Sequence, residues 1–203
     1  MNRNLVMVFT RNPELGKVKT RLAKTIGDKS ALIIYKQLLK HTEKTIKQVA
    51  ADKAVYYSVD INENDLWDNT IYQKFMQSGS DLGERMKHAF INAFEAKYSK
   101  VIIVASDLYD ITPNHIENAI QQLDKHDIVI GPSFDGGYYL LGMNRFYDSA
   151  FNKKQWGTET VLKDTLSDLK PLNVKLLESI NDIDTYDDIK DISELSDLIA
   201  ING

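Results

Sequence analysis

The sequence predicts an α/β protein built on a mostly parallel sheet with helices on both faces. Short apolar runs that suit buried strands occur along the chain, and residues 5–9 and 101–105 are the clearest of them. Segments with apolar residues at helical spacing lie between these runs. Strands that alternate with helices are typical of parallel sheets. The 203 residues show no repeat and no linker, so we expect one domain over residues 1–203.

The first half of the chain begins with the strand at 5–9, whose apolar run is too short for a helix. The next periodic segment predicts a helix that Asp28 or Ser30 can cap and whose apolar stripe ends near Val49. After it we expect a short strand, a polar stretch without an assigned element, and a loop that enters a helix. These are residues 55–59, 60–76 and 77–86, and the stripe of that helix is Met86, Ala89, Phe90, Ala93 and Phe94.

The second half begins with the most apolar strand of the sequence, residues 101–105. Pro113 stands in the first turn of the following helix, where a missing N–H leaves no hydrogen bond unmade. Gly131-Pro132 ends the next strand, and a glycine-rich turn leads into another. A helix, a strand and a closing helix complete the chain. The expected bounds of these elements are 112–123, 127–132, 138–143, 158–169, 174–177 and 186–199.

Composition excludes several classes of function. Hydrophobic residues make up 43% and charged residues 27% of the chain, and the net charge is −4. An acidic chain of this kind is not expected to bind nucleic acid or an anionic membrane through bulk charge. The absence of cysteine excludes disulfides, zinc–thiolate sites and a thiol nucleophile, and the four histidines have no metal-ligand spacing. No apolar run approaches a membrane span, so we expect a cytoplasmic protein.

Four cations follow the first strand within a short loop: Arg11, Lys17, Lys19 and Arg21. A basic loop behind a strand is a common way for α/β proteins to bind phosphate at the carboxyl edge of the sheet. A solvated basic loop is the alternative. The loop lacks the glycine spacing of a P-loop, and no G-x-G-x-x-G follows the strand. We therefore expect side-chain charge, more than glycine amides, to bind a small anionic ligand.

Carboxylates stand at two places where a metal could bind. Asp107 comes just after the strand at 101–105, where it could hold Mg²⁺ against a diphosphate or simply begin a turn. An acidic cluster precedes the last helix, and capping or helix-dipole charge explains most of it. One member of the cluster could be a second metal ligand, although position alone does not select it. The cluster consists of Asp182, Asp184, Asp187 and Asp188.

Two further segments have both a structural and a functional interpretation. Asp135-Gly136-Gly137 before Tyr138 can be an ordinary tight turn, or it can allow close approach of the backbone to a ring or sugar. Trp156 to Thr158 can be a helix cap with a core tryptophan, or it can line a ligand pocket. Spacing alone does not separate these alternatives.

Six segments, taken in order, resemble a known family. They are residues 9–22 with the pattern Phe-x-Arg-x-Pro-x-x-Gly-x-Val-Lys-Thr-Arg-Leu, residues 79–86, Ser106-Asp107, residues 131–140, Trp156-Gly157-Thr158 and Asp182-Ile183-Asp184-Thr185. The chain resembles a bacterial family of proposed GT-A-type transferases, often called glycosyltransferase-like. That family is distantly similar to phospholactate guanylyltransferase and molybdenum cofactor guanylyltransferase. The resemblance implies a three-layer α/β/α, Rossmann-like GT-A fold with a mostly parallel mixed sheet.

The resemblance also implies roles for individual residues, with Mg²⁺ or Mn²⁺ as cofactor. It makes Lys19, Arg21 and Asp107 catalytic, and Asp107 and Asp184 metal ligands. The nucleotide-binding residues that it implies are Arg11, Gly16, Lys19, Arg21, Asp81, Gly83 and Arg85. The acceptor-binding residues that it implies are Asp135, Gly136, Gly137, Tyr138, Trp156 and Thr158. We expect Lys19, Asp107, Asp135 and Asp184 to converge on one cleft at the carboxyl edge of the sheet.

The reaction expected from the resemblance is metal-dependent transfer from a nucleoside triphosphate or a nucleotide-sugar. Family members usually continue Asp-Cys-Pro after the central strand, whereas this chain continues Asp107-Leu108-Tyr109. Because the chain lacks Asp-x-Asp at that place, nucleotidyl transfer is favoured over glycosyl transfer. A non-catalytic nucleotide-binding module is the other alternative, and no base, acceptor or oligomeric state is predicted. We also expect Asp107 and Asp184 to repel each other without a cation, so that Asp107→Asn would not destabilise the free protein.

Overall fold

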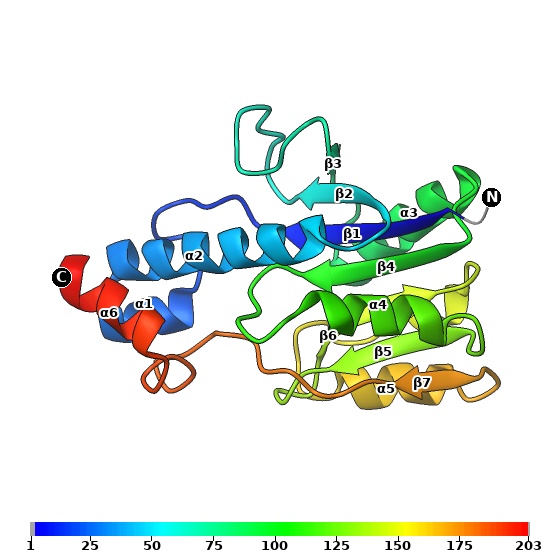
Figure 1. Ribbon diagram of the computed structural model, residues 1–203. Coiled ribbons are helices and arrows are strands. Elements are labelled where there is room, and N and C mark those ends of the chain that lie inside the picture. Colours follow the sequence, from blue (N-terminus) through cyan, green and yellow to red (C-terminus); the bar gives the residue numbers. More distant parts are fainter. Residues whose placement is uncertain (1–2, 203) are drawn as a thin grey trace.

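The computed structural model describes residues 3–202 as a seven-stranded sheet with helices on both faces (Figure 1). Within these residues, no helix is both long enough and apolar enough to cross a membrane. The elements of the first half are β1 (Asn4–Thr10), α1 (Thr20–Ile26), α2 (Asp28–Lys47), β2 (Asp52–Tyr57), β3 (Tyr72–Met76), α3 (Leu82–Glu95) and β4 (Lys100–Ala105). Those of the second half are α4 (Pro113–Gln122), β5 (Ile128–Pro132), β6 (Tyr138–Met143), the 3₁₀ helix η1 (Asp148–Phe151), α5 (Val161–Asp168), β7 (Val174–Leu176) and α6 (Ser193–Asn202).

The sheet is mixed but mostly parallel, as expected. Its strand order is β3-β2-β1-β4-β6-β5-β7, so β4 occupies the middle position. Strands β1, β2, β3 and β4 pair in parallel, and β5 pairs in parallel with β7. Only β6 runs the other way, between β4 and β5. The carboxyl ends of β1, β2, β4 and β5 therefore share one edge, and β6 begins there.

Two hydrophobic cores cover the two faces of the sheet. Successive residues of a strand point to opposite faces, and in β1 both sets are buried: Val6 and Val8 in one core, Leu5 and Met7 in the other. Helices α2 and α4 cover the first face, and α3 and α5 the second; in Figure 1, α2 and α4 lie in front of the strands and α3 and α5 behind them. Burial on both faces explains why the strands are apolar runs without polar alternation.

Several boundaries differ from those that the sequence predicts. Residues 20–22, expected in the opening loop, begin α1, so that Arg21 lies on a helix. Gly27, and neither Asp28 nor Ser30, is the N-cap of α2, since its φ of 82° suits a glycine between two helices. The unassigned stretch 60–76 contains the edge strand β3. Strand β2 and helices α5 and α6 begin at Asp52, Val161 and Ser193 in place of 55, 158 and 186.

The late start of α6 has a local cause. Asp188 accepts hydrogen bonds from the backbone N–H groups of Asp184 and Thr185, at 3.0 and 2.6 Å, and from the Thr185 hydroxyl. These bonds close a turn where the apolar spacing alone predicts helix. The sequence pattern does not reveal this competition, because Asp and Thr are common both in turns and at helix starts.

A third apolar cluster joins the beginning and the end of the chain. Leu22 of α1 and Ile34 and Leu38 of α2 pack with Ile183, Ile189 and Leu195. In Figure 1 the segment after β7, drawn in orange and red, leads to α6 beside α1 and α2. This cluster therefore brings residues 182–189 to the carboxyl edge of the sheet.

Candidate functional site

A cavity of about 730 Å³ opens at the carboxyl edge of the sheet. Lys19, Asp107, Asp135 and Asp184 all line it, so the convergence expected from the sequence is observed. The lining comes from the ends of β1 and β4, the start of β6, the first turn of α3 and the segments at 156–158 and 182–184. Segments more than 170 residues apart in sequence thus meet at one place.

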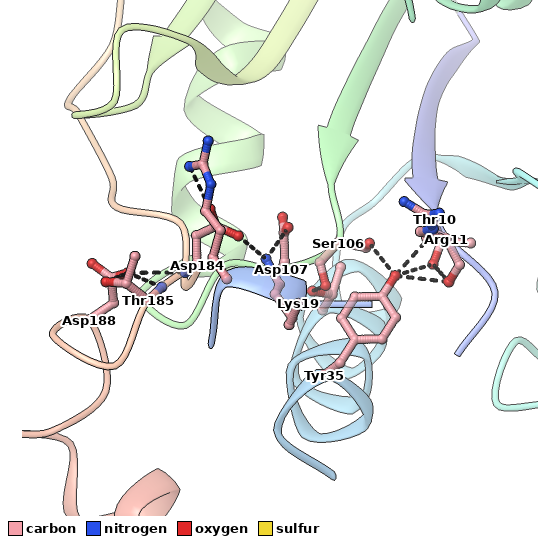
Figure 2. Close-up of polar contacts among 11 residues, drawn as sticks. Thr10, Arg11, Lys19, Tyr35, Ser106, Asp107, Asp184, Thr185 and Asp188 are labelled. Carbon is pink, nitrogen blue, oxygen red and sulfur yellow. Dashed lines mark hydrogen bonds and ion pairs between the residues drawn. The ribbon is translucent and has the colours of Figure 1, made fainter. Parts of the chain in front are cut away.

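Lys19 lies between the two predicted metal ligands (Figure 2). Its Nζ donates to Asp107 Oδ2 at 2.6 Å and lies 4.0 Å from Asp184 Oδ1. The Lys19 side chain is only 7% exposed. Burial opposes its charge, but the attraction and hydrogen bond of Asp107 more than offset this and raise the pKa of Lys19 above its ordinary value. The expected destabilising repulsion between Asp107 and Asp184 assumed that no cation lies near them, and the Lys19 ammonium removes that condition.

Backbone contacts fix this cluster. Ile183 N–H donates to the carbonyl of Asp107 at 3.2 Å, and Leu108 pairs with Asp182 in an antiparallel bridge. Leu108 is fully buried, so the departure from Asp-Cys-Pro places an apolar anchor directly after Asp107. Lys19 is the N-cap of α1 in the left-handed conformation, with φ 47°. That conformation is uncommon outside glycine, and the helix start and the ion pair hold it in place.

Asp182 is a site residue that the sequence pattern did not select. It lines the cavity beside Asp107, and burial, together with repulsion from Asp107 and Asp135, raises its pKa to about 6. The signal that could have identified it is the alternation Asp182-Ile183-Asp184. Ile183 is buried, and in an extended segment its two neighbours point to the opposite side together.

Three cations line the cavity without an acidic partner in the described residues: Arg11, Lys17 and Arg85. Arg85 Nε donates to the carbonyl of Gly79 at 3.2 Å, which orients the guanidinium without neutralising it. Arg11 is held through its backbone, since its N–H donates to the Tyr35 hydroxyl at 3.0 Å and its carbonyl accepts from the same hydroxyl at 2.9 Å (Figure 2). The helical stripe predicts a buried Tyr35 but not this use of its hydroxyl.

An apolar wall adjoins the charged groups. Phe9, Tyr138 and Trp156 line the cavity together with Leu82 and Met86 of α3. Trp156 packs directly on the backbone of α3, because a Cβ at Gly83 would lie 2.3 Å from Cε2 of the indole. The lack of a side chain at Gly83 therefore allows Trp156 to pack closely on α3, and the Gly83 backbone supports the apolar wall.

The predicted site residues divide into those that line the cavity and those that do not. Lining residues are Arg11, Lys19, Arg85, Asp107, Asp135, Gly137, Tyr138, Trp156, Thr158 and Asp184. Residues outside the lining are Gly16, Arg21, Asp81, Gly83 and Gly136. Arg21 pairs with Asp184 at 2.9 Å from the exposed rim, and Asp81 caps α3 by accepting from Glu84 N–H at 2.8 Å. A Cβ at Gly136 would lie 2.0 Å from the carbonyl oxygen of Glu159.

Asp107 and Asp184 could hold a divalent cation, although no cluster of three metal-binding side chains occurs in the described part of the chain. Both carboxylates already face one cation, the Lys19 ammonium. Mg²⁺ commonly takes one or two protein carboxylates and completes its shell with phosphate oxygens and water. The carboxylates of Asp107 and Asp184 therefore suit a metal ion that binds together with a phosphate ligand better than a metal ion held by protein ligands alone.

Comparison with known proteins identifies relatives over most of the chain. The model of a family described as "Uncharacterized protein conserved in bacteria" (DUF2064) matches residues 41–158. A proposed nucleotide-diphospho-sugar transferase from Desulfovibrio desulfuricans G20 is 31% identical, with a TM-score of 0.85 over 99% of this chain and 98% of that one.

More distant similarities follow. A 2-phospho-L-lactate guanylyltransferase from Methanocaldococcus sp. (strain FS406-22) is 25% identical over 132 residues, which are 63% of this chain and 54% of that protein. The chain thus spans about half the length of the curated relatives it matches. The 4-diphosphocytidyl-2C-methyl-D-erythritol synthase from Anaerococcus prevotii DSM 20548 shares the fold, with a TM-score of 0.60 at 11% identity over 98% of this chain and 96% of that one.

Proposed function

We propose that this chain, which belongs to the DUF2064 family of bacterial proteins, is a GT-A-like nucleotidyltransferase that binds a nucleoside triphosphate in the cavity. The observation that carries the proposal is the arrangement of charge. Three cations that have no acidic partner within residues 3–202 line the same cavity as a pair of carboxylates that already face a cation. The transferase names of the relatives, guanylyl and nucleotide-diphospho-sugar, agree with this chemistry.

Each charged group has a task in such a transfer. Arg11, Lys17 and Arg85 bind phosphate oxygens, and a guanidinium can do so with two hydrogen bonds. An ammonium has three N–H donors, so Lys19 can bind Asp107 and a phosphate oxygen at the same time. Arg21, on the rim, adds positive charge near the leaving pyrophosphate. Transfer of this kind depends mainly on positioning and on charge stabilisation.

Asp107 and Asp184 would hold Mg²⁺ or Mn²⁺. When bound, such an ion neutralises charge on the phosphates and orients the α-phosphate. The protein's contribution is the rigid placement of the two carboxylates. Asp107 follows the central strand, and Asp184 is held by the turn that Asp188 closes.

Glycosyl transfer from a nucleotide-sugar is the second candidate. The aromatic side chains of Tyr138 and Trp156 at the cavity favour it, because a sugar ring packs its C–H face on such groups. The same cations and carboxylates would then bind a diphosphate that remains with the nucleoside.

Product analysis separates these reactions. The protein is incubated with Mg²⁺, nucleoside triphosphates, nucleotide-sugars and small-molecule extract, and the released product is identified. Pyrophosphate indicates nucleotidyl transfer, and a nucleoside diphosphate indicates glycosyl transfer. Nucleotide binding without either product would instead indicate a non-catalytic module and contradict the proposal.

The cationic side chains provide the binding test. Arg85→Ala is expected to weaken binding of Mg²⁺-nucleotide about tenfold or more, since a charge-assisted contact contributes roughly 1.5–3 kcal/mol. Calorimetric titration measures the change. Lys125→Ala is the control, because Lys125 is exposed between α4 and β5, at the opposite edge of the sheet. Equal affinities of the two variants would exclude Arg85 from the nucleotide site.

A further inference from the structure

The cavity has walls of opposite charge. The cationic wall consists of Arg11, Lys17 and Arg85, which come from the β1–α1 loop and from α3. The acidic wall consists of Asp107, Asp135, Asp182 and Asp184, which come from the segments after β4 and β5 and before α6. A bound triphosphate belongs against the cationic wall. Because Lys19 and a metal on Asp107 and Asp184 would also contact the phosphates, the part of the acidic wall left for the acceptor is formed by Asp135 and Asp182.

Lys19, Arg21 and a divalent ion together would match the four charges of the acidic wall, so the charge that the acceptor meets depends on which carboxylates they contact. Lys19 compensates Asp107, and Arg21 compensates Asp184 from the rim. A divalent ion would take the same two carboxylates. Asp135 and Asp182 form no ion pair within residues 3–202, and Asp135 is held only by the Gly137 N–H, at 2.9 Å. Two carboxylates, Asp135 and Asp182, therefore face the acceptor region without a direct ion pair in the described residues.

The same region offers aromatic and aliphatic surface. Tyr138 follows Asp135 by three residues, and Trp156 packs on α3, whose Leu82 and Met86 line the cavity together with Phe9. Carboxylate oxygens accept hydrogen bonds from hydroxyl groups. An aromatic ring packs against the apolar face of a bound molecule. A phosphate or carboxylate placed beside Asp135 and Asp182 would meet like charge that no ion pair within the described residues offsets.

We propose, on the basis of the nucleotide transfer proposed above, that the acceptor is an uncharged, hydroxyl-bearing molecule with an apolar face and that the acidic wall excludes anionic acceptors. In the nucleotidyl reaction its hydroxyl oxygen bonds to the α-phosphorus while the bond from that phosphorus to the pyrophosphate oxygen breaks. Pyrophosphate leaves with the bonding electrons, and the hydroxyl proton passes to water. This acceptor differs from 2-phospho-L-lactate, named for the curated relatives, which carries a phosphate and a carboxylate.

Collisional quenching of tryptophan fluorescence tests the charge of the acceptor region directly. The chain has two tryptophans, and Trp67 is only 1% exposed, so Trp156 reports on the cavity. Neutral acrylamide and caesium ions are expected to quench Trp156 several-fold more efficiently than iodide. Lys154 lies 4.9 Å from the centre of the Trp156 ring, and its charge is paired with Asp168 at 3.1 Å, so this neighbour does not account for weak iodide quenching.

Matched variants attribute the effect to the acidic wall. Asp135→Asn, alone and with Asp182→Asn, is expected to raise iodide quenching toward the acrylamide level, while Trp156→Phe removes most quenchable fluorescence. Asp135 is exposed, so its single variant is expected to keep the fold. Iodide quenching of the parent protein as efficient as that by caesium would overturn the inference. So would iodide quenching that the Asn variants leave unchanged.

A transfer assay tests the acceptor itself. With Mg²⁺ and GTP, the parent protein is expected to form no guanylylated product from 2-phospho-L-lactate, and formation of that product would overturn the inference while supporting nucleotidyl transfer. Nucleotide affinity is measured by calorimetry on the same samples. Failure to bind any nucleotide would overturn the proposed function. Nucleotide binding together with guanylylation of 2-phospho-L-lactate would overturn only the inferred acceptor charge.

Discussion

Lys19 places an ammonium between two carboxylates inside the cavity wall, with 7% of its side chain exposed. A buried ion pair adds little to the free energy of unfolding, because the cost of removing both charges from water offsets their attraction. Loss of one partner is costly, because the other charge then stays buried and unpaired. The consequences therefore depend on which partner is changed. They are asymmetric, because Asp107 is 28% exposed and can recover some hydration, whereas Lys19 cannot.

We predict that Asp107→Asn lowers the free energy of unfolding of the free protein by about 1–3 kcal/mol, because it removes the carboxylate 2.6 Å from the Lys19 ammonium. Urea denaturation measures the change. The double variant Lys19→Met with Asp107→Asn should recover part of the loss, since it removes both charges. A gain in stability for Asp107→Asn alone would restore the view that the two carboxylates repel each other.

Asp182 leads to a prediction about pH. Its pKa is raised from 3.8 to about 6 by burial and by Asp107 and Asp135, so the folded protein holds the proton more tightly than the unfolded chain does. Ionised Asp182 therefore destabilises the fold above about pH 6, and this cost disappears as pH falls below about 4. Asp182→Asn is expected to raise stability at pH 8 by about 1 kcal/mol, after allowance for solvent screening, and to change little at pH 4.

The measurement is thermal unfolding of parent and variant across this pH range. The difference in melting temperature should appear between pH 4 and 6 and stay constant above. A difference in melting temperature that does not vary with pH would mean that Asp182→Asn changes stability by some means other than removing the carboxylate charge.

At the scale of elements, the first turn of α3 and the segment at 154–158 form one unit. Gly83 lies under the Trp156 indole, where a Cβ would be 2.3 Å from Cε2. Gly83→Ala should favour the helix by propensity yet displace the indole, with a net loss of about 1–3 kcal/mol. Melting temperature and the emission maximum of Trp156 measure the two effects.

The control for this prediction removes the ring. In a Trp156→Ala background the clash is absent, so Gly83→Ala is expected to be neutral or slightly stabilising. If Gly83→Ala costs the same in both backgrounds, the close approach of Trp156 is not the reason for the glycine.

The elements also show what the sequence could predict and what it could not. The strand at 101–105 was predictable, because burial on both faces leaves a continuous apolar run. Helix α1 was not, since it is short and begins inside a basic loop where Lys19 adopts a left-handed conformation. The candidate site was predictable as a set of charged residues at strand ends. The contact of Lys19 with Asp107 was not, because no periodicity encodes which cation meets which carboxylate.

At the scale of the whole molecule, the site depends on joining the two ends of the chain. Ile183 packs with Leu22 and Leu195 in the cluster that unites α1, α2 and α6, and its neighbours Asp182 and Asp184 face the cavity. The position of these carboxylates is therefore set by a core that lies outside the cavity. Stability of that core and affinity of the site should be linked.

This linkage gives the last prediction. Leu195→Ala and Leu169→Ala each remove a fully buried leucine, and each is expected to cost about 2–5 kcal/mol. Leu195 belongs to the cluster that holds Ile183, whereas Leu169 lies in the core under α5. Only Leu195→Ala should also weaken binding of Mg²⁺-nucleotide, by several-fold, because Asp184 loses its fixed position. Calorimetric titration well below both melting temperatures measures this, and equal affinity in the two variants would show that residues 182–184 hold their place without α6.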